Sequence, residues 1–274
     1  MRTIDFDSQF TAYLRAWLEA HQDEFEDIAQ LELIMPQLYE QFADTPAPFL
    51  DGFTPRQFFE RMDSPRQLLD LMLAYLSQQV PLPDLLLQRL AELGEAAEEH
   101  LAQLLLDPGQ MLEARMICVR LLQDLGSTRL MQHYINWQLQ REDRDELADF
   151  CLESLEEMGE LPLPFMLEAL QDANDIGREA LLSVLSRYPG LPGVYEGLIR
   201  LFDALPERQA ILAAYLGRLG DERALPQLIA RAGEEGLRYL DYIELRAAIE
   251  ALGGEAPERV FDDDPDYNTW MGIG

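Results

Sequence analysis

The side chains that most often bind metals or act as nucleophiles are scarce in this chain of 274 residues. It has three histidines, His21, His100 and His133, and two cysteines, Cys118 and Cys151. One or two histidines do not complete a metal site, so we interpret them as partly exposed helix residues. Two cysteines are too few for a disulfide framework or for the ligand count of the usual zinc site. The sequence therefore predicts no metal and no cofactor.

Carboxylates, by contrast, are abundant. Because the chain has 51 acidic residues, the presence of any one pair of them does not indicate a general acid and base. Glu98 with Glu99, and Glu156 with Glu157, are pairs of this kind. The aspartate-rich run at residues 262–266 lacks the glycine and the terminal glutamate of a calcium loop. We find neither a glycine-rich phosphate loop nor a nucleophile-elbow motif. No catalytic residue is predicted, and we expect a protein that is not an enzyme.

Net charge narrows the choice of partner. The 21 basic and 51 acidic residues give −30, and every basic residue is arginine, because lysine is absent. Without lysine there is no P-loop lysine and no Schiff-base chemistry. So acidic a chain is not expected to bind nucleic acid or an anionic membrane, since both require cations. A protein partner with a basic surface is compatible with this charge; the plainer alternative is that the charge serves solubility.

The chain also lacks the signals of a membrane or secreted protein. No stretch approaches the roughly 18 apolar residues of a membrane helix. The first residues, Met1 to Asp5, lack the basic and then apolar order of a signal peptide. We expect a soluble, cytoplasmic protein.

The elements that position these residues repeat about every thirty residues. Glycines recur with successive gaps of 32, 33, 31, 30 and 33 residues, at Gly94, Gly126, Gly159, Gly190, Gly220 and Gly253. In the fifteen residues ending at each glycine, positions 7, 11 and 14 are mostly apolar and share one helical face. Glycine supplies the left-handed residue that ends a helix. Each window is therefore predicted to be the second helix of a helical hairpin.

The repeat explains the cysteines. Cys118 and Cys151 occupy position 7, where the other four copies carry leucine. A buried cysteine behaves as a small hydrophobic residue, so we interpret both as core residues and not as a redox pair.

A second periodic run follows several of the glycines. Residues such as Val194, Tyr195, Leu198 and Ile199 have the spacing of an amphipathic helix. One hairpin cannot bury two apolar stripes alone, whereas stacked hairpins can. The segment Gly220-Asp-Glu-Arg-Ala-Leu-Pro-Gln-Leu-Ile229 resembles the short HEAT-like repeat of bacterial proteins. That resemblance covers residues 80–254 and implies an all-α fold, an α-α superhelix or solenoid of about six hairpins.

The ends of the chain do not follow the period. Residues 1–79 are predicted to form a helical N-terminal cap continuous with the solenoid. Within it, Thr54 and Ser64 each precede a proline and then a glutamine at the third helical position, which is typical of a helix start. Residues 255–274 form an acidic and aromatic tail. Its Tyr267, Trp270 and Met271 suit a docking peptide, but the tail could equally fold back on the last repeat or be disordered.

Two functional hypotheses remain. The first is a non-catalytic protein-interaction or scaffolding module, because solenoids bind partners along the face of their second helices. Positions 9, 12 and 13 of the central copies would form that face: Arg120, Gln123, Asp124, Glu153, Glu156, Glu157, Val184, Arg187 and Tyr188. An ordinary solvated face is the plainer interpretation. The second hypothesis is a small-ligand carrier or enzyme with a pocket between the N-terminal cap and the first repeats. It rests on the aromatic residues there, Trp17, Phe42, Phe49, Phe53, Phe58 and Phe59, which could instead simply pack the cap.

Overall fold

The computed structural model describes the backbone of residues 3–21 and 28–271, and the side chains of 3–21 and 31–269. All regular structure in these residues is helical, and none of them lies in a β-strand. The predicted all-α fold class is therefore confirmed. The chain divides into two compact units, Met1–Ser127 and Thr128–Gly274, which are described separately below. We call them unit 1 and unit 2.

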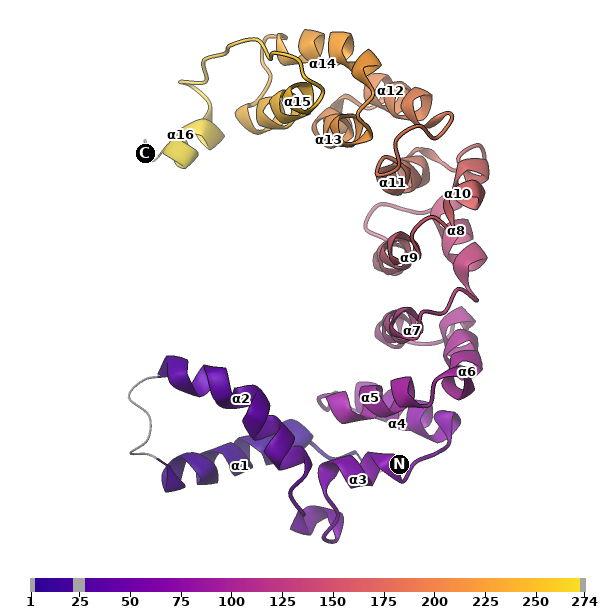
Figure 1. The fold of residues 1–274 in the computed structure, drawn as a ribbon, viewed down its shortest axis with the longest axis vertical. Coiled ribbons are helices and arrows are strands. Elements are labelled where there is room, and N and C mark those ends of the chain that lie inside the picture. The colour runs from indigo at the N-terminus through magenta and orange to yellow at the C-terminus, as the bar shows by residue number, and fades with distance from the viewer. Residues whose placement is uncertain (1–2, 22–27, 272–274) are drawn as a thin grey trace. The chain divides into compact units, whose positions relative to one another are not determined.

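Unit 1 contains seven α-helices and one short 3₁₀ helix within the described residues (Figure 1). They are α1 (Phe6–Ala20), α2 (Ile28–Ala43), η1 (Pro48–Leu50), α3 (Pro55–Glu60), α4 (Pro65–Ser77), α5 (Asp84–Glu92), α6 (Glu95–Leu106) and α7 (Leu112–Asp124). Helices α4 and α5 form one hairpin and α6 and α7 the next, with α4 packed on α6 and α5 packed on α7. Like elements of successive hairpins are thus neighbours.

Unit 2 continues the same alternation. Its elements are α8 (Met131–Leu139), α9 (Glu146–Glu157), α10 (Leu163–Ala169), α11 (Asp175–Leu185), α12 (Val194–Ala204), η2 (Pro206–Arg208), α13 (Gln209–Leu219), η3 (Glu222–Ala224), α14 (Leu225–Ala232), α15 (Tyr239–Ala251) and α16 (Pro265–Met271). The second helices α9, α11, α13 and α15 pack in sequence as one layer, and α8, α10, α12 and α14 lie on the other side (Figure 1). Four helical hairpins therefore stack within unit 2.

The six repeat glycines all have a positive φ angle, as the sequence predicts, although Gly94, with ψ at −131°, lies outside the left-handed helical region. Their φ angles lie between 56° and 86°. At Gly220, which follows α13, the backbone N–H donates to Leu216 O and so closes the helix. A residue with a Cβ is strained at such an angle, which is why glycine recurs at these turns.

Two of the three positions predicted to share the apolar face are buried in every copy. At position 7, Leu86, Cys118, Cys151, Leu182, Leu212 and Leu245 are all 0% exposed. At position 11, Leu90, Leu122, Leu155, Ser186, Leu216 and Ile249 are at most 1% exposed. Position 14 is buried only at Leu219 and Leu252; Leu93, Leu125 and Met158 are half-buried, and Pro189 is exposed. Positions 7 and 11, one helical turn apart, therefore form the apolar seam on the second helix of each hairpin.

The fourth copy departs from the pattern at position 9. Val184 was predicted to be exposed on the binding face, and this is wrong, because it is fully buried. Helix α11 packs against α8, α9, α12 and α13, so neighbours cover more of its circumference than a single stripe. Its sequence supplies the wider apolar surface that this requires, with Leu181 and Leu185 also buried.

The two predicted helix starts in unit 1 are both present. The Thr54 hydroxyl accepts from the backbone N–H of Gln57, whose side chain in turn accepts from Thr54 N–H, which completes a capping box. The Ser64 hydroxyl accepts from Gln67 N–H at the start of α4. Helix α2 runs on past Pro36, which lies in its interior.

Two interior glycines permit close helix contacts in unit 2. A Cβ added to Gly177 of α11 would lie 1.8 Å from the carbonyl oxygen of Gln138 in α8. A Cβ added to Gly217 of α13 would lie 2.9 Å from the Cα of Ala248 in α15. Because both obstacles are backbone atoms, a larger residue could be accepted only if the helices moved apart.

This close approach predicts the effect of Gly177→Ala. The added methyl group should push α11 away from α8 and lower the free energy of unfolding by about 3 kcal/mol, at the upper end for overpacked cores. Urea unfolding followed by circular dichroism measures the change. Gly233→Ala is the matched control, since its Cβ would lie no closer than 3.5 Å to any atom and its φ is −84°. Equal stability of the two variants would contradict the packing argument.

Candidate binding surface

In unit 2 the predicted face begins on α9. The carboxylate of Asp145 accepts from Ala148 N–H and starts this helix, which buries Cys151 and Leu155 on one side. On the opposite side Glu153 and Glu157 are exposed, one helical turn apart. Neither side chain forms a hydrogen bond or an ion pair with another described residue. These two carboxylates are therefore available to a partner.

Glu156 of α9 has a different role from its neighbour Glu157. Its carboxylate forms an ion pair with Arg187 at 2.8 Å, and both residues occupy position 12 of their copies. The Glu156 side chain is 27% exposed and that of Arg187 49%, so the pair is largely solvated and contributes little to stability. Tyr188 beside it is half-buried. Position 12 thus lies at the boundary between successive second helices.

The remaining predicted face residues belong to unit 1. Arg120 and Asp124 on α7 are exposed as predicted, and Gln123 is half-buried. The structure therefore brings together Glu153, Glu156 and Glu157 on α9, with Arg187 paired to the second of them. Arg120, Gln123 and Asp124 form a separate group on their own unit.

Asp149 extends the row of carboxylates on α9 and was missed by the sequence analysis. It is exposed and lies four residues before Glu153, so three carboxylates follow one another at one-turn spacing. We call Asp149, Glu153 and Glu157 the acidic ridge. The four-residue spacing was visible in the sequence, but position 5 had not been assigned to the face.

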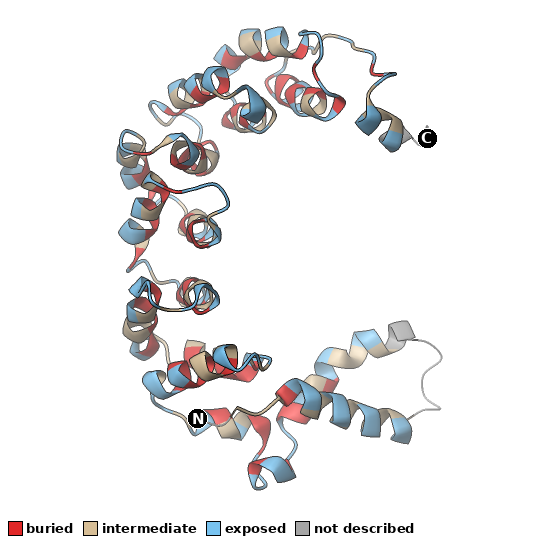
Figure 2. Ribbon diagram, turned by 180° about the vertical axis from the view of Figure 1, so that it is seen from behind, coloured by how far each residue is buried: buried red, intermediate tan, exposed pale blue. Residues whose placement is uncertain are grey.

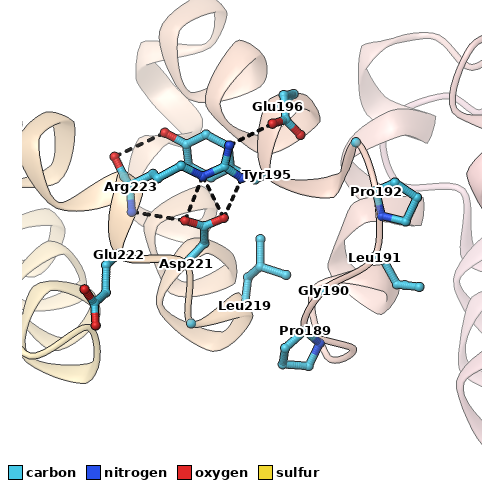
Figure 3. Close-up of a pocket in the computed structure, with 12 residues that line it drawn as sticks. Pro189, Gly190, Leu191, Pro192, Tyr195, Glu196, Leu219, Asp221, Glu222 and Arg223 are labelled. Carbon is cyan, nitrogen blue, oxygen red and sulfur yellow. Dashed lines mark hydrogen bonds and ion pairs between the residues drawn. The ribbon is translucent and has the colours of Figure 1, made fainter.

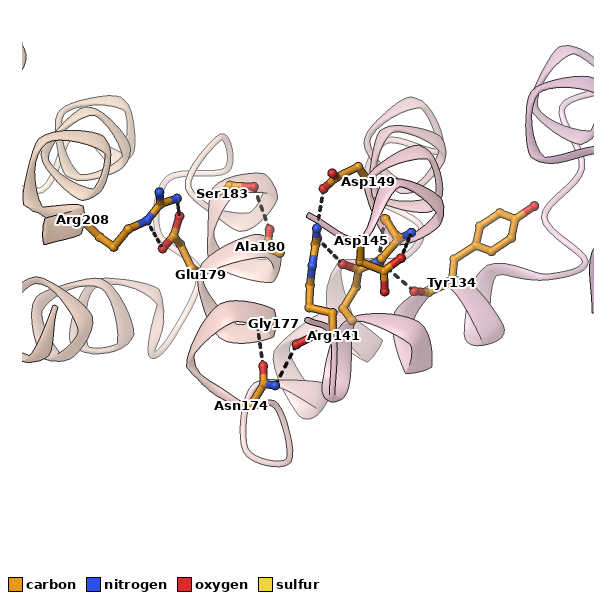
Figure 4. A network of polar contacts seen from close by, with 12 residues as sticks. Tyr134, Arg141, Asp145, Asp149, Asn174, Gly177, Glu179, Ala180, Ser183 and Arg208 are labelled. Atoms are coloured by element: carbon orange, nitrogen blue, oxygen red, sulfur yellow. Dashed lines mark hydrogen bonds and ion pairs between the residues drawn. The ribbon is translucent and has the colours of Figure 1, made fainter. Parts of the chain in front are cut away.

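A buried polar network holds the base of the acidic ridge (Figure 4). The side chain of Gln138 is fully buried; it donates to Ala148 O at 2.9 Å and accepts from the Arg141 guanidinium at 2.9 Å. Arg141 also pairs with Asp149. The amide group of Asn174 donates to Arg141 O at 2.9 Å and accepts from Gly177 N–H at 2.8 Å. Buried polar groups need hydrogen-bond partners, and these groups find them on neighbouring helices. The network therefore links α8, α9 and α11.

A second polar contact joins α11 to the start of α13. The guanidinium of Arg208 binds both carboxylate oxygens of Glu179, one through Nε at 2.9 Å (Figure 4). The side chain of Glu179 is only 11% exposed, so hydrogen bonds from Arg208 replace most of those that the carboxylate would form with water. The same contact raises the pKa of Arg208 above its usual value, chiefly through the hydrogen bond.

An open groove of about 850 Å³ lies between two successive repeat turns of unit 2 (Figure 3). Its walls are the Pro189–Gly193 turn and the Leu219–Arg223 turn. The Arg223 guanidinium lies 3.9 Å above the Tyr195 ring and is paired with Asp221 and Glu196. The hydrogen bond from Arg223 also lowers the pKa of Asp221. These charges satisfy one another, whereas the exposed carboxylate of Glu222, which also lines the groove, forms no ion pair with another described residue.

The described part of the tail folds back on the last repeat. The backbone N–H of Tyr239 donates to Asp264 at 2.9 Å, which lowers the pKa of that carboxyl below its usual value. The ring of Tyr267 packs edge-on against Tyr239, with centroids 5.0 Å apart, and Phe261 is buried. The side chains of Trp270 and Met271, the other two candidates for tail docking, lie outside the described residues.

The aromatic residues of the N-terminal region pack against one another. Phe6 lies 5.3 Å from Phe59 and 6.0 Å from Phe58, centroid to centroid, and Phe59 is 1% exposed. A hollow beside Phe59, between α3 and α5, measures only about 10 Å³. A site for a small molecule needs some hundreds of cubic ångströms, so this hollow gives the carrier hypothesis no support.

The residues that could do chemistry are dispersed. His133 is exposed, and His100 is half-buried with Nδ1 lacking a hydrogen-bond partner. Within the part of the chain that the structure describes, no three His, Cys, Asp or Glu residues gather as metal ligands would. Burial raises the pKa of the Cys118 thiol to about 12. None of the described helices is both long enough and apolar enough to cross a membrane.

Comparison of the chain with protein-family models, with curated proteins and with solved structures finds no significant match.

The burial of both cysteines predicts their reactivity. The thiolate is the nucleophile, and at pH 8 a thiol of pKa about 12 is almost wholly protonated. We expect Ellman's reagent to label no thiol in the folded protein at pH 8, and both Cys118 and Cys151 in guanidinium chloride. Rapid labelling of the folded protein would contradict the assignment of these residues to the core.

The contact between Glu179 and Arg208 predicts a difference in stability between two arginine variants. Arg208→Ala should leave an almost buried carboxylate without its partner and lower the free energy of unfolding by about 2 kcal/mol. Arg223→Ala, whose two carboxylate partners are more exposed, should have a clearly smaller effect. Thermal and urea unfolding of the two variants, measured side by side, test this order of stabilities.

Proposed function

We propose that the chain is an α-solenoid of the HEAT type and that it acts as a non-catalytic protein-binding module. The repeat of glycine turns and buried positions 7 and 11 supports the architecture. Hairpins that stack in one direction leave their second helices as a continuous layer, which is where solenoids bind extended partners. Within unit 2 that layer contains α9, α11, α13 and α15.

The acidic ridge is the observation that carries this proposal. Like charges four residues apart on a helix repel each other and cost a few tenths of a kcal/mol per pair. Asp149 is compensated by Arg141, but Glu153 and Glu157 have no cation within the described residues. The helix therefore carries a small electrostatic cost that a cationic partner would remove.

The partner follows from this chemistry. It is a protein segment with arginine or lysine side chains spaced to meet carboxylates about 6 Å apart, the rise of four helical residues. Tyr188, half-buried just after α11, and the solvated ion pair between Glu156 of α9 and Arg187 give the segment further polar contacts. Nucleic acid and anionic membranes do not fit, because the surface and the chain as a whole are acidic.

The proposal predicts opposite effects on stability and binding. Glu153→Gln should raise the free energy of unfolding slightly, by about 0.3 kcal/mol, because its repulsion of Glu157 is lost, together with a weaker repulsion of Asp149, which is paired with Arg141. It should nevertheless weaken binding of the partner severalfold, since a charged contact is lost. Urea unfolding and titration calorimetry measure the two quantities.

The partner itself is to be captured from a cell extract with the wild-type chain as bait. Glu153→Arg/Glu157→Arg should then release it, and raising the salt concentration should weaken the wild-type complex. The control is Glu222→Arg/Glu235→Arg, which changes the net charge equally at exposed positions away from α9. Release by both double variants alike would show that only net charge matters and would reject the ridge as the site.

A further inference from the structure

At its base, the described part of the α1–α2 hairpin contacts the rest of unit 1. Phe10 of α1 lies 5.2 Å from Tyr39 and 5.4 Å from Phe42 of α2, centroid to centroid. Ahead of α1, the backbone N–H of Ile4 donates to the hydroxyl group of Tyr75 in α4, and Phe6 packs on Phe59. These contacts fix the N-terminal end of α1 and the C-terminal end of α2.

Beyond this base the apolar side chains are not fully covered. Two groups of three are all half-buried, namely Leu14, Trp17 and Leu18 on α1 and Leu31, Ile34 and Met35 on α2. The burial-coloured view agrees, with red confined to the base of the hairpin and tan and blue along the rest (Figure 2). By contrast, Leu38 and Phe42 at the base are 2% and 4% exposed.

The geometry of helix packing explains the difference. An amphipathic helix of a globular protein carries an apolar stripe more than about 100° wide, which one neighbouring helix cannot cover. Helices α4 to α7 each pack on two or more other helices, whereas α1 packs chiefly on α2. A third helix laid along the α1–α2 seam would complete the burial, as in helix bundles. The 15 residues of α1 span about 22 Å, so this helix needs about four turns.

The charges around the α1–α2 seam indicate which charge the covering helix should carry. The exposed acidic residues of the two described helices are Asp7, Glu19, Glu32 and Glu40, against a single arginine, Arg15. Glu40 is already paired with Arg56, but Glu19 and Glu32 form no ion pair with another described residue. A second copy of the same hairpin would bring like charges together, which disfavours self-association.

We propose that the α1–α2 hairpin is a docking site for a basic amphipathic helix of a partner protein. Its apolar face covers Trp17, Leu18 and Ile34, and its lysine or arginine side chains reach Glu19 and Glu32. This site and the acidic ridge consist of different residues, and the test of this site does not depend on the function proposed above.

The test uses the full-length chain and a fluorescent 18-residue peptide of leucine and lysine, with leucine at helical spacings i, i+3, i+4 and i+7. Two comparison peptides control for charge and for amphipathicity: one has glutamate in place of lysine, and the other has the lysine–leucine composition in scrambled order. Fluorescence anisotropy at about 150 mM salt should give binding of the first peptide at least tenfold tighter than that of either control.

Variants then place the peptide. Glu19→Arg/Glu32→Arg should weaken binding at least tenfold, while Glu222→Arg/Glu235→Arg, with the same change in net charge, should leave it within twofold. The intrinsic tryptophan emission of the chain should shift to the blue on binding, and Trp17→Phe should abolish that shift although the anisotropy still reports binding. Leu18→Asp should weaken binding without lowering the helix content measured by circular dichroism.

Three results would overturn the proposal. They are equal binding of the ordered and scrambled peptides, equal effects of the two double reversals, and an emission shift that persists in Trp17→Phe. Sedimentation supplies a fourth: a dimer of the wild-type chain that dissociates in Leu18→Asp would assign the seam to a second copy of the chain.

Discussion

The structure depends on the burial of two side chains per repeat, one helical turn apart, on each second helix. Positions 7 and 11 are at most 1% exposed in all six copies, and each buried leucine contributes roughly 2 kcal/mol of transfer free energy. One hairpin cannot enclose both of its apolar stripes, and within each unit successive hairpins cover one another. This constraint places the polar residues of the second helices opposite the seam, and it thereby creates the surface on which the acidic ridge lies.

Much of this was predictable from the sequence because the information is local. A glycine every 30 to 33 residues and leucines four residues apart define a helix, its end and its buried side without reference to distant residues. Val184 was not predictable, since its burial results from the number of helices that surround α11. Nor was the role of Gly177, because only the path of α8 brings the carbonyl group of Gln138 to 1.8 Å from the Cβ position.

The candidate surface was likewise predictable from the sequence only in part. The exposure of Glu153 and Glu157 followed from helical periodicity, whereas the pairing of Glu156 with Arg187 depends on how two successive second helices align. Gln138 and Arg141 form a buried network that hydrophobic patterning cannot detect, since both residue types are usually exposed. The tail had three possible arrangements in the sequence, and the hydrogen bond between Tyr239 and Asp264 shows that the described part folds back.

The absence of lysine has a consequence for how this surface responds to its surroundings. Every basic side chain other than histidine is a guanidinium group, which stays protonated at any pH at which proteins fold. Burial raises the pKa of Tyr39, Tyr75 and Tyr215, and that of Cys118 to about 12. The electrostatic potential of the molecule therefore hardly changes between neutral and moderately alkaline conditions. Ionic strength, which screens exposed charges over about 8 Å in physiological salt, is the variable that can modulate its long-range attraction for cations.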